Sequence, residues 1–127
     1  MDWGVKLVGI AVAGSCGALA RYGLAGMIAR RLGPSFPWST LAVNALGCFL
    51  FGLIWALAQE KWMISGEWRA IVLIGFIGSF TTFSTLIFET DQLLEHAEWM
   101  LAGLNVGAEL GLGLLAYLAG AAVGRWI

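Results

Sequence analysis

The chain has 127 residues, of which 60% are hydrophobic and 12% are charged, and its net charge is -1. Soluble domains usually carry about 25% charged residues, so this composition indicates a membrane protein with one domain over residues 1–127. The low net charge and the lack of a basic run argue against nucleic acid as a partner.

Four apolar stretches cover about residues 5–29, 39–58, 68–88 and 99–123. Each has about 20 residues or more, which is enough for a helix to cross a hydrocarbon core of about 30 Å. We therefore predict an all-α membrane protein with four transmembrane helices. The first stretch is too long for the apolar part of a signal peptide, so we expect it to be a retained helix.

The first stretch contains several small residues and one cation, Arg21. Gly14 and Gly17 favour close helix packing, because small side chains let helix backbones approach each other in lipid. Two interpretations of Arg21 remain open. Its side chain either extends to the membrane surface or forms an electropositive vestibule for anions.

In the second stretch Thr40, Asn44 and Cys48 follow at intervals of four and share one helix face. The Asn44 amide needs partners in lipid, so it either joins helices or lines an ion path. Cys16 and Cys48 show no spacing typical of a metal site.

The third stretch contains "GFIGSFTTFST", residues 75–85, with two glycines and five hydroxyl residues. Such a segment predicts a broken helix, since hydroxyl groups can satisfy the backbone groups that a break leaves free. Unwound carbonyl groups at membrane depth can coordinate a bare cation such as sodium. The alternative is that each hydroxyl bonds the carbonyl four residues earlier in an unbroken helix.

In the fourth stretch Gly103, Gly107 and Gly111 predict a close-packing face, and Glu109 points away from it together with Asn105. A carboxyl group inside a membrane indicates a functional site. The alternative is a neutral, hydrogen-bonded acid without a function of its own.

The loop charges give a weak orientation signal. With four spans, four cations lie opposite two: Lys6, Lys61, Arg69 and Arg125 against Arg30 and Arg31. The side richer in Lys and Arg normally faces the cytoplasm, so this small excess is compatible with insertion in both orientations or in one.

Taken together, these motifs resemble the Fluc/CrcB fluoride channels of microbes. "GFIGSFTTFST" carries the resemblance, with "GALARY" in the first stretch, "WSTLAVNALG" in the second and "LNVGAELGLGLLAYLAG" in the fourth. The likeness covers the whole chain in length, number of spans and order of motifs.

The resemblance implies a passive channel that exports fluoride across the bacterial inner (plasma) membrane. It implies an antiparallel, dual-topology homodimer in membrane lipid, with two pores and a central structural sodium ion bound by the carbonyl groups of Gly78 and Thr81. The expected fluoride pore residues are Asn44, Phe83, Ser84, Thr85, Leu86, Asn105 and Glu109. The expected vestibule and pathway residues are Arg21, Thr40 and Glu89.

The chain departs from the family pattern in three places. Leu86 stands where the family often has a second phenylalanine, and Ser79 and Phe80 replace a common Gly-Leu pair. Glu109 replaces a serine or asparagine, and an ionised carboxyl would repel fluoride, so we expect either a protonated or paired carboxyl there or weaker conduction than is usual in the family.

The main rival function is a proton-coupled exporter of the small multidrug type that uses Glu109. Against it, those exporters have their glutamate in the first span, where this chain has only Arg21. An enzyme is not expected, since the lone His96 has no nucleophile or metal set around it.

Overall fold

The computed structural model describes residues 1–60 and 64–127, and the regular structure in these residues is helical. Lys61, one of the loop charges counted above, lies outside the described residues. The elements in chain order are α1 (Trp3–Leu32), α2 (Trp38–Glu60), α3 (Gly66–Ala70), the π-helical η1 (Ile71–Ile77), α4 (Gly78–Phe80), α5 (Phe83–Glu95) and α6 (Trp99–Trp126).

Four spans in the described part are long and apolar enough to cross a membrane: Trp3–Leu32, Trp38–Gln59, Gly66–Glu95 and Trp99–Trp126. This confirms the predicted all-helical, four-span fold of a multi-pass membrane protein. The third span consists of α3, η1, α4 and α5 in succession.

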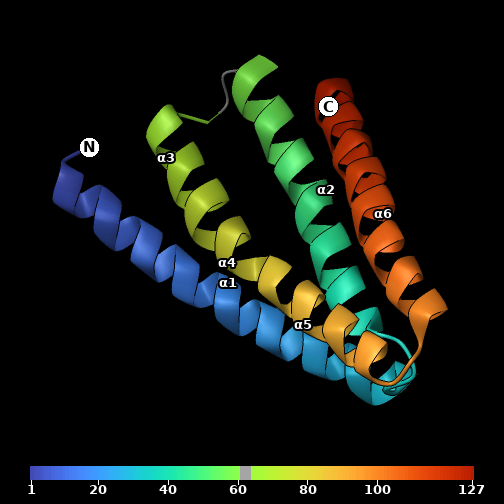
Figure 1. Cartoon of the computed structure of the whole chain (residues 1–127). Helices are drawn as coiled ribbons and strands as arrows, with labels where there is room; N and C mark the ends of the chain where they lie inside the picture. Colours follow the sequence, from blue (N-terminus) through green and yellow to red (C-terminus); the bar gives the residue numbers. More distant parts are fainter. Residues whose placement is uncertain (61–63) are drawn as a thin grey trace.

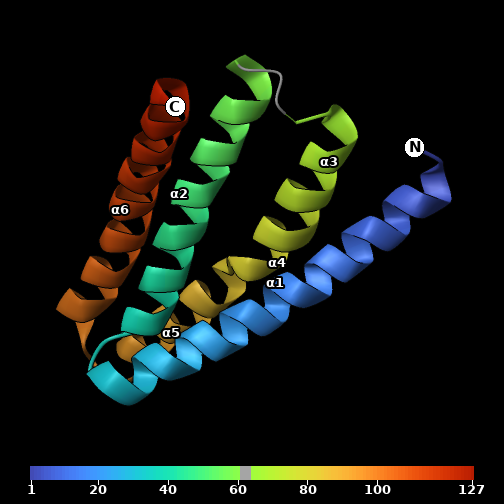
Figure 2. The same cartoon turned by 180° about the vertical axis from the view of Figure 1, so that it is seen from behind.

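The helices form two pairs (Figures 1 and 2). One pair is α2 with α6, which run side by side, and the other is α1 with the third span. Both termini lie at the same end of the molecule, as an even number of spans requires.

The third helix is broken, as predicted, and the break is at Thr81 and Thr82. Both residues have extended backbone, with φ/ψ of -84°/156° and -147°/113°, between the helical Phe80 and Phe83. The segment predicted to break contains Gly75, but the break does not occur there. Gly75 lies inside η1 and allows close packing. A Cβ added at Gly75 would lie 2.9 Å from the Ile10 carbonyl oxygen of α1.

The prediction of a close-packing face at Gly103, Gly107 and Gly111 is wrong for the contacts inside this chain. A Cβ added at any of the three would meet no atom within 4 Å. The α2–α6 pair instead approaches through Gly52 and Gly120, where an added Cβ would overlap the carbonyl groups of Tyr117 and Phe49 respectively. These contacts fix the register of the two helices that carry the polar residues described next.

Candidate functional site

The break in the third span is held by one side chain from α2. The Asn44 Oδ1 atom accepts a hydrogen bond from the Thr82 N–H at 2.8 Å, and the Asn44 Nδ2 group donates to the Thr82 carbonyl at 3.1 Å. One amide therefore satisfies both backbone groups of an extended residue, which membrane burial would otherwise leave unpaired.

This pairing frees backbone carbonyl groups before the break. In an unbroken helix the Thr82 N–H would donate to Gly78, but here it donates to Asn44. Within the described residues, neither the Gly78 nor the Thr81 carbonyl accepts a hydrogen bond across the break, whereas the Ser79 carbonyl accepts one from Arg21 Nε at 3.1 Å. In residues 1–60 and 64–127, no hydrogen bond across the break thus occupies either of the two carbonyl groups expected to bind sodium.

The hydroxyl groups that follow the break mainly cap the N-terminus of the next helix, α5. Thr82 is the N-cap residue of α5, and its Oγ1 atom accepts from the Thr85 N–H at 3.3 Å. The Thr82 Oγ1 also lies 2.9 Å from the Thr85 hydroxyl and 3.4 Å from the exposed Ser84 hydroxyl. Thr81 makes the alternative bond foreseen from the sequence, donating to the Ile77 carbonyl at 3.0 Å. Capping and local bonding therefore account for much of this hydroxyl cluster.

The Asn44 amide also connects α2 to α6. Its Nδ2 group donates to Glu109 Oε2 at 3.0 Å, while Glu109 Oε1 is buried without a partner in the described structure. Glu109 is only 7% exposed, although its side chain is long and polar. Its predicted orientation, away from Gly103, Gly107 and Gly111, is confirmed, but Glu109 and not the glycine face is the side of α6 that meets the other helices.

A second polar layer lies one helical turn further along the same faces. Thr40 donates to Glu89 Oε1 at 2.7 Å, and Asn105 Nδ2 donates to the Thr90 hydroxyl at 3.0 Å. Glu89 Oε2 and Asn105 Oδ1 are buried without partners in the described structure, and Asn105 is fully buried. The two layers form a column of polar groups between α2, α5 and α6.

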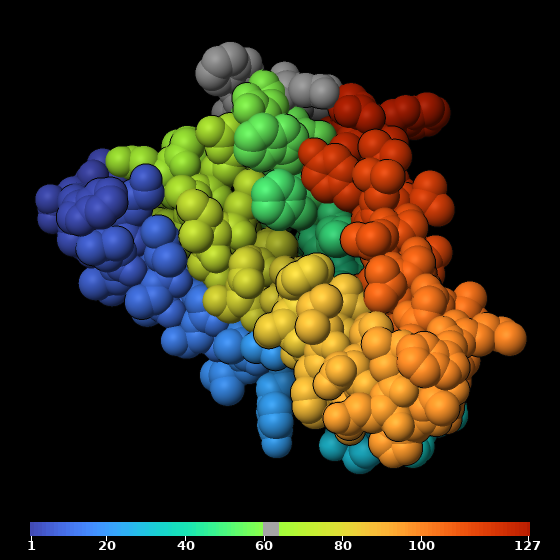
Figure 3. Space-filling model, viewed as in Figure 1, coloured from blue at the N-terminus to red at the C-terminus, as the bar shows by residue number. Residues whose placement is uncertain are grey.

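A groove of about 290 Å³ opens beside the first layer. Asn44 and Glu109 line it, together with two other predicted residues, Phe83 and Leu86. Phe83 is 71% exposed, so its ring stands at the margin of the groove, while Leu86 is buried. In Figure 3, α2 is visible at the bottom of a hollow between the third span and α6.

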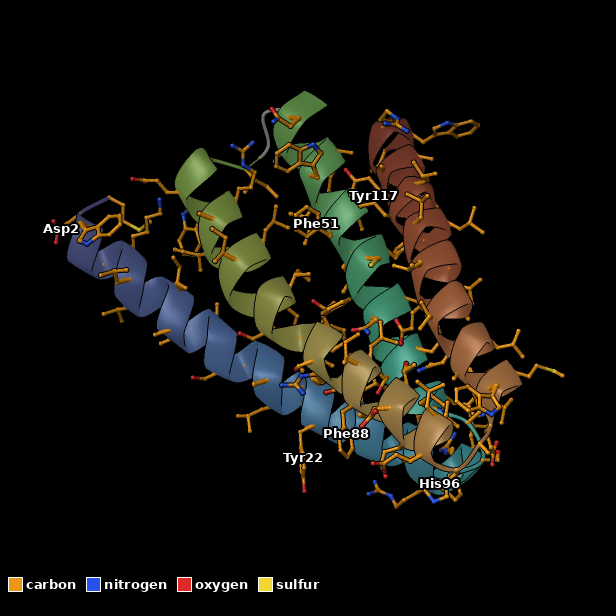
Figure 4. The ribbon with its side chains drawn as sticks, in the orientation of Figure 1. Asp2, Tyr22, Phe51, Phe88, His96 and Tyr117 are labelled. Atoms are coloured by element: carbon orange, nitrogen blue, oxygen red, sulfur yellow. The ribbon has the colours of Figure 1, made fainter. Side chains whose placement is uncertain are left out.

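Sequence reasoning missed part of this site. Phe51 and Tyr117 also line the groove, with ring centroids 6.2 Å apart, and in Figure 4 Tyr117 lies between α6 and α2 while Phe51 lies beside α2 on the side of the third span. Aromatic residues are common in apolar spans, and only the register of the helices shows which of them meet. Thr82 and Thr90 were likewise not selected, although both bond a predicted pore asparagine.

Two further predicted residues, Arg21 and Glu89, lie between the break and the end of the bundle where α1 and α5 end. Glu89 lines a hollow of about 420 Å³, and Arg21 lines one of about 740 Å³ that also includes Arg30. Ser39 lines both hollows, so they are adjacent. Of the two interpretations of Arg21, extension to the membrane surface alone is disfavoured, because its Nε group donates a hydrogen bond to the Ser79 carbonyl of the broken span.

Comparison with known proteins decides the family. Residues 8–121 match the family described as "CrcB-like protein, Camphor Resistance (CrcB)". This chain belongs to the CrcB family. The resemblance inferred from the motifs is therefore confirmed.

Curated relatives within the CrcB family are closely similar to this chain. A protein of Nitrosococcus oceani is 51% identical over 96% of this chain and 98% of its own length. Proteins of Solidesulfovibrio magneticus and Geobacter sulfurreducens are 50% and 47% identical over 96% and 94% of this chain, covering 98% and 96% of their own lengths. Each of these relatives is named "Fluoride-specific ion channel FluC".

Proposed function

We propose that this chain forms a fluoride-selective, passive ion channel that exports fluoride and relieves its toxicity. The observation that carries the proposal is the 51% identity, over nearly the full length of both chains, to a relative named as a fluoride-specific channel. The polar column beside the helix break supports it independently. A small, strongly hydrated anion must exchange water for hydrogen-bond donors, and amide and hydroxyl groups supply them here.

The proposed path follows the column and the groove. Fluoride enters past Arg21, Thr40 and Glu89 and passes the second layer at Asn105. It then reaches the groove, where Asn44, Phe83, Ser84, Thr85, Leu86 and Glu109 are the proposed contacts. Phenyl ring edges carry partial positive charge, which suits Phe83 at the groove margin to contact an anion.

Glu109 requires a specific protonation state in this scheme. Its Oε2 atom accepts a bond from Asn44, so a proton on the unpartnered Oε1 would give the groove one further donor. An ionised carboxyl would instead oppose an anion at the same place. We therefore propose that Glu109 is neutral while the channel conducts.

The active unit is proposed to be an antiparallel homodimer with two pores, in which one copy is inserted in each orientation in the bacterial inner membrane. A sodium ion at its centre would be held by the Gly78 and Thr81 carbonyl groups of both copies. Among the described residues no hydrogen bond across the break occupies these carbonyl groups, which fits such a role, and carbonyl oxygen is a suitable ligand for a hard cation. The ion would supply positive charge and hold the two breaks together.

Passive movement is part of the proposal because the sequence contains no GxxxxGK[ST] phosphate-binding loop to drive transport. A growth experiment tests the function in cells. Bacteria that lack their own fluoride exporter should grow in fluoride medium when they express this chain. Unchanged fluoride sensitivity, with the protein present in the membrane fraction, would contradict the proposal.

A further inference from the structure

The groove contains a thiol group that the proposed fluoride path does not use. Cys48 lines the groove one helical turn after Asn44, on the same face of α2. Opposite it on α6 is Gly113, and a Cβ added there would lie 3.5 Å from the Cys48 Sγ atom. The thiol therefore occupies space that a side chain at position 113 would otherwise restrict.

A buried carboxyl group faces the same space. Glu109 lies one turn before Gly113 on α6, and its Oε1 atom is buried without a partner in the described structure. Asn44 holds the other oxygen at 3.0 Å, on the turn of α2 that precedes Cys48. A soft sulfur ligand and a free carboxyl oxygen thus project into one groove from facing turns of two packed helices.

We propose that Cys48 and Glu109 form a binding site for a thiophilic divalent cation such as Cd²⁺. Thiolate sulfur selects soft metal ions, and a carboxylate oxygen is a suitable second ligand. On binding, the sulfur–hydrogen bond breaks, a metal–sulfur bond forms, and the proton passes to water without any change of oxidation state. A proton on Glu109 would leave in the same way.

The site differs from a structural metal centre. The described residues contain no cluster of three or more His, Cys, Asp or Glu side chains that could hold a metal ion. With two protein ligands, the ion would complete its coordination with water. A cation bound here engages the carboxyl that Asn44 contacts and obstructs the groove, and this effect on fluoride flux rests on the proposed function.

Binding is tested first without any measurement of flux. Purified Cys16→Ser protein is titrated with Cd²⁺, and the ultraviolet charge-transfer absorption of the cadmium–thiolate bond is recorded. Cys16 is exposed on α1 and lies outside the groove, so removing it isolates the signal of Cys48. We expect saturable absorption that is lost in Cys16→Ser/Cys48→Ser and an apparent affinity at least about tenfold weaker in Cys16→Ser/Glu109→Gln.

A protection experiment needs no substitution at the site. Cd²⁺ should slow the modification of Cys48 in Cys16→Ser protein by a methanethiosulfonate reagent. Equal cadmium affinity with and without the Glu109 carboxyl, or modification at an unchanged rate, would overturn the site. Cadmium binding in a protein that passes no fluoride would contradict the proposed function and leave the metal site standing.

Discussion

The side-chain amide of Asn44 pairs with both backbone groups of Thr82, accepting from its N–H at 2.8 Å and donating to its carbonyl at 3.1 Å. The same Nδ2 group donates to Glu109. The break in the third span and the buried acid of the fourth span are therefore held in place by one residue of the second.

Asn44→Ala should destabilise the folded protein and abolish fluoride conduction. The substitution leaves the N–H and the carbonyl of the half-buried Thr82 without their present partner, at a cost of up to about 1–3 kcal/mol for each group. Thermal unfolding in detergent measures the stability, and fluoride efflux measures the function. Cys48→Ala, one turn along the same helix face, is the control for a simple loss of side-chain volume. If Asn44→Ala unfolds at the same temperature as the unchanged protein, the amide does not support the break.

Glu109→Gln should preserve fluoride conduction, whereas Glu109→Ala should reduce it. Glutamine keeps a hydrogen-bond donor beside the Asn44 amide, and alanine removes it. Conduction in Glu109→Gln should also depend less on pH above neutrality, since an amide cannot lose a proton there. Fluoride efflux at several pH values checks both results. A Glu109→Gln protein that transports nothing, beside an active Glu109→Asp protein, would favour the proton-coupled exporter instead.

Sodium binding should depend on the backbone carbonyl groups at the break and not on the side chains there. Thr81→Ser keeps the carbonyl group and should retain sodium binding, while a bulky residue such as valine at Gly78 should abolish it. A Cβ added at Gly78 meets its nearest atom, the Leu73 carbonyl oxygen, at 3.5 Å, which is an ordinary contact. Loss of sodium binding in a Gly78 variant whose thermal stability is unchanged would therefore arise at the proposed ion site.

The sodium experiment has a matched control at Gly75, where an added Cβ would be only 2.9 Å from the Ile10 carbonyl oxygen. Gly75→Ala should lower stability through the α1 contact at every sodium concentration. Equilibrium binding of ²²Na⁺ to each purified variant separates the two effects. Failure of Thr81→Ser to bind sodium, in a protein with unchanged stability, would argue against ligation by the main chain.

A cysteine introduced at a terminus should be labelled from both sides of the membrane. The loop charges favour neither orientation strongly, and the proposed dimer contains one copy of each. The experiment uses a Cys16→Ser/Cys48→Ser background and a membrane-impermeant maleimide, applied to intact cells and then to permeabilised cells. About half of the sites should react before permeabilisation, as one copy in each orientation requires. Labelling from a single side would end the dual-topology proposal.

The sequence predicted the parts of this molecule that follow from local chemistry. Length and hydrophobicity were sufficient for the four spans, and the density of hydroxyl residues between Ser79 and Thr85 was sufficient for a break. Helical periodicity alone placed Thr40 and Asn44 on one face and Glu109 with Asn105 on another, and both faces meet the polar column.

What the sequence did not predict depends on how the helices pack. Periodicity identified a glycine face at Gly103 and Gly107, but it cannot distinguish a face that meets another helix of the same chain from one that does not. Gly52 belongs to no glycine repeat at intervals of four, and yet it approaches the Tyr117 carbonyl closely. The pairing of Phe51 with Tyr117 follows from that register and could not be found beforehand.

Fluoride efflux from liposomes that contain the purified protein tests the central claim most directly. Liposomes loaded with potassium fluoride or potassium chloride are diluted into halide-free medium, valinomycin is added to balance the charge, and each halide is followed with an ion-selective electrode. A passive, selective channel predicts rapid fluoride efflux that needs no proton gradient, with chloride retained. Equal efflux of both halides, or efflux only when a proton gradient is imposed, would contradict it.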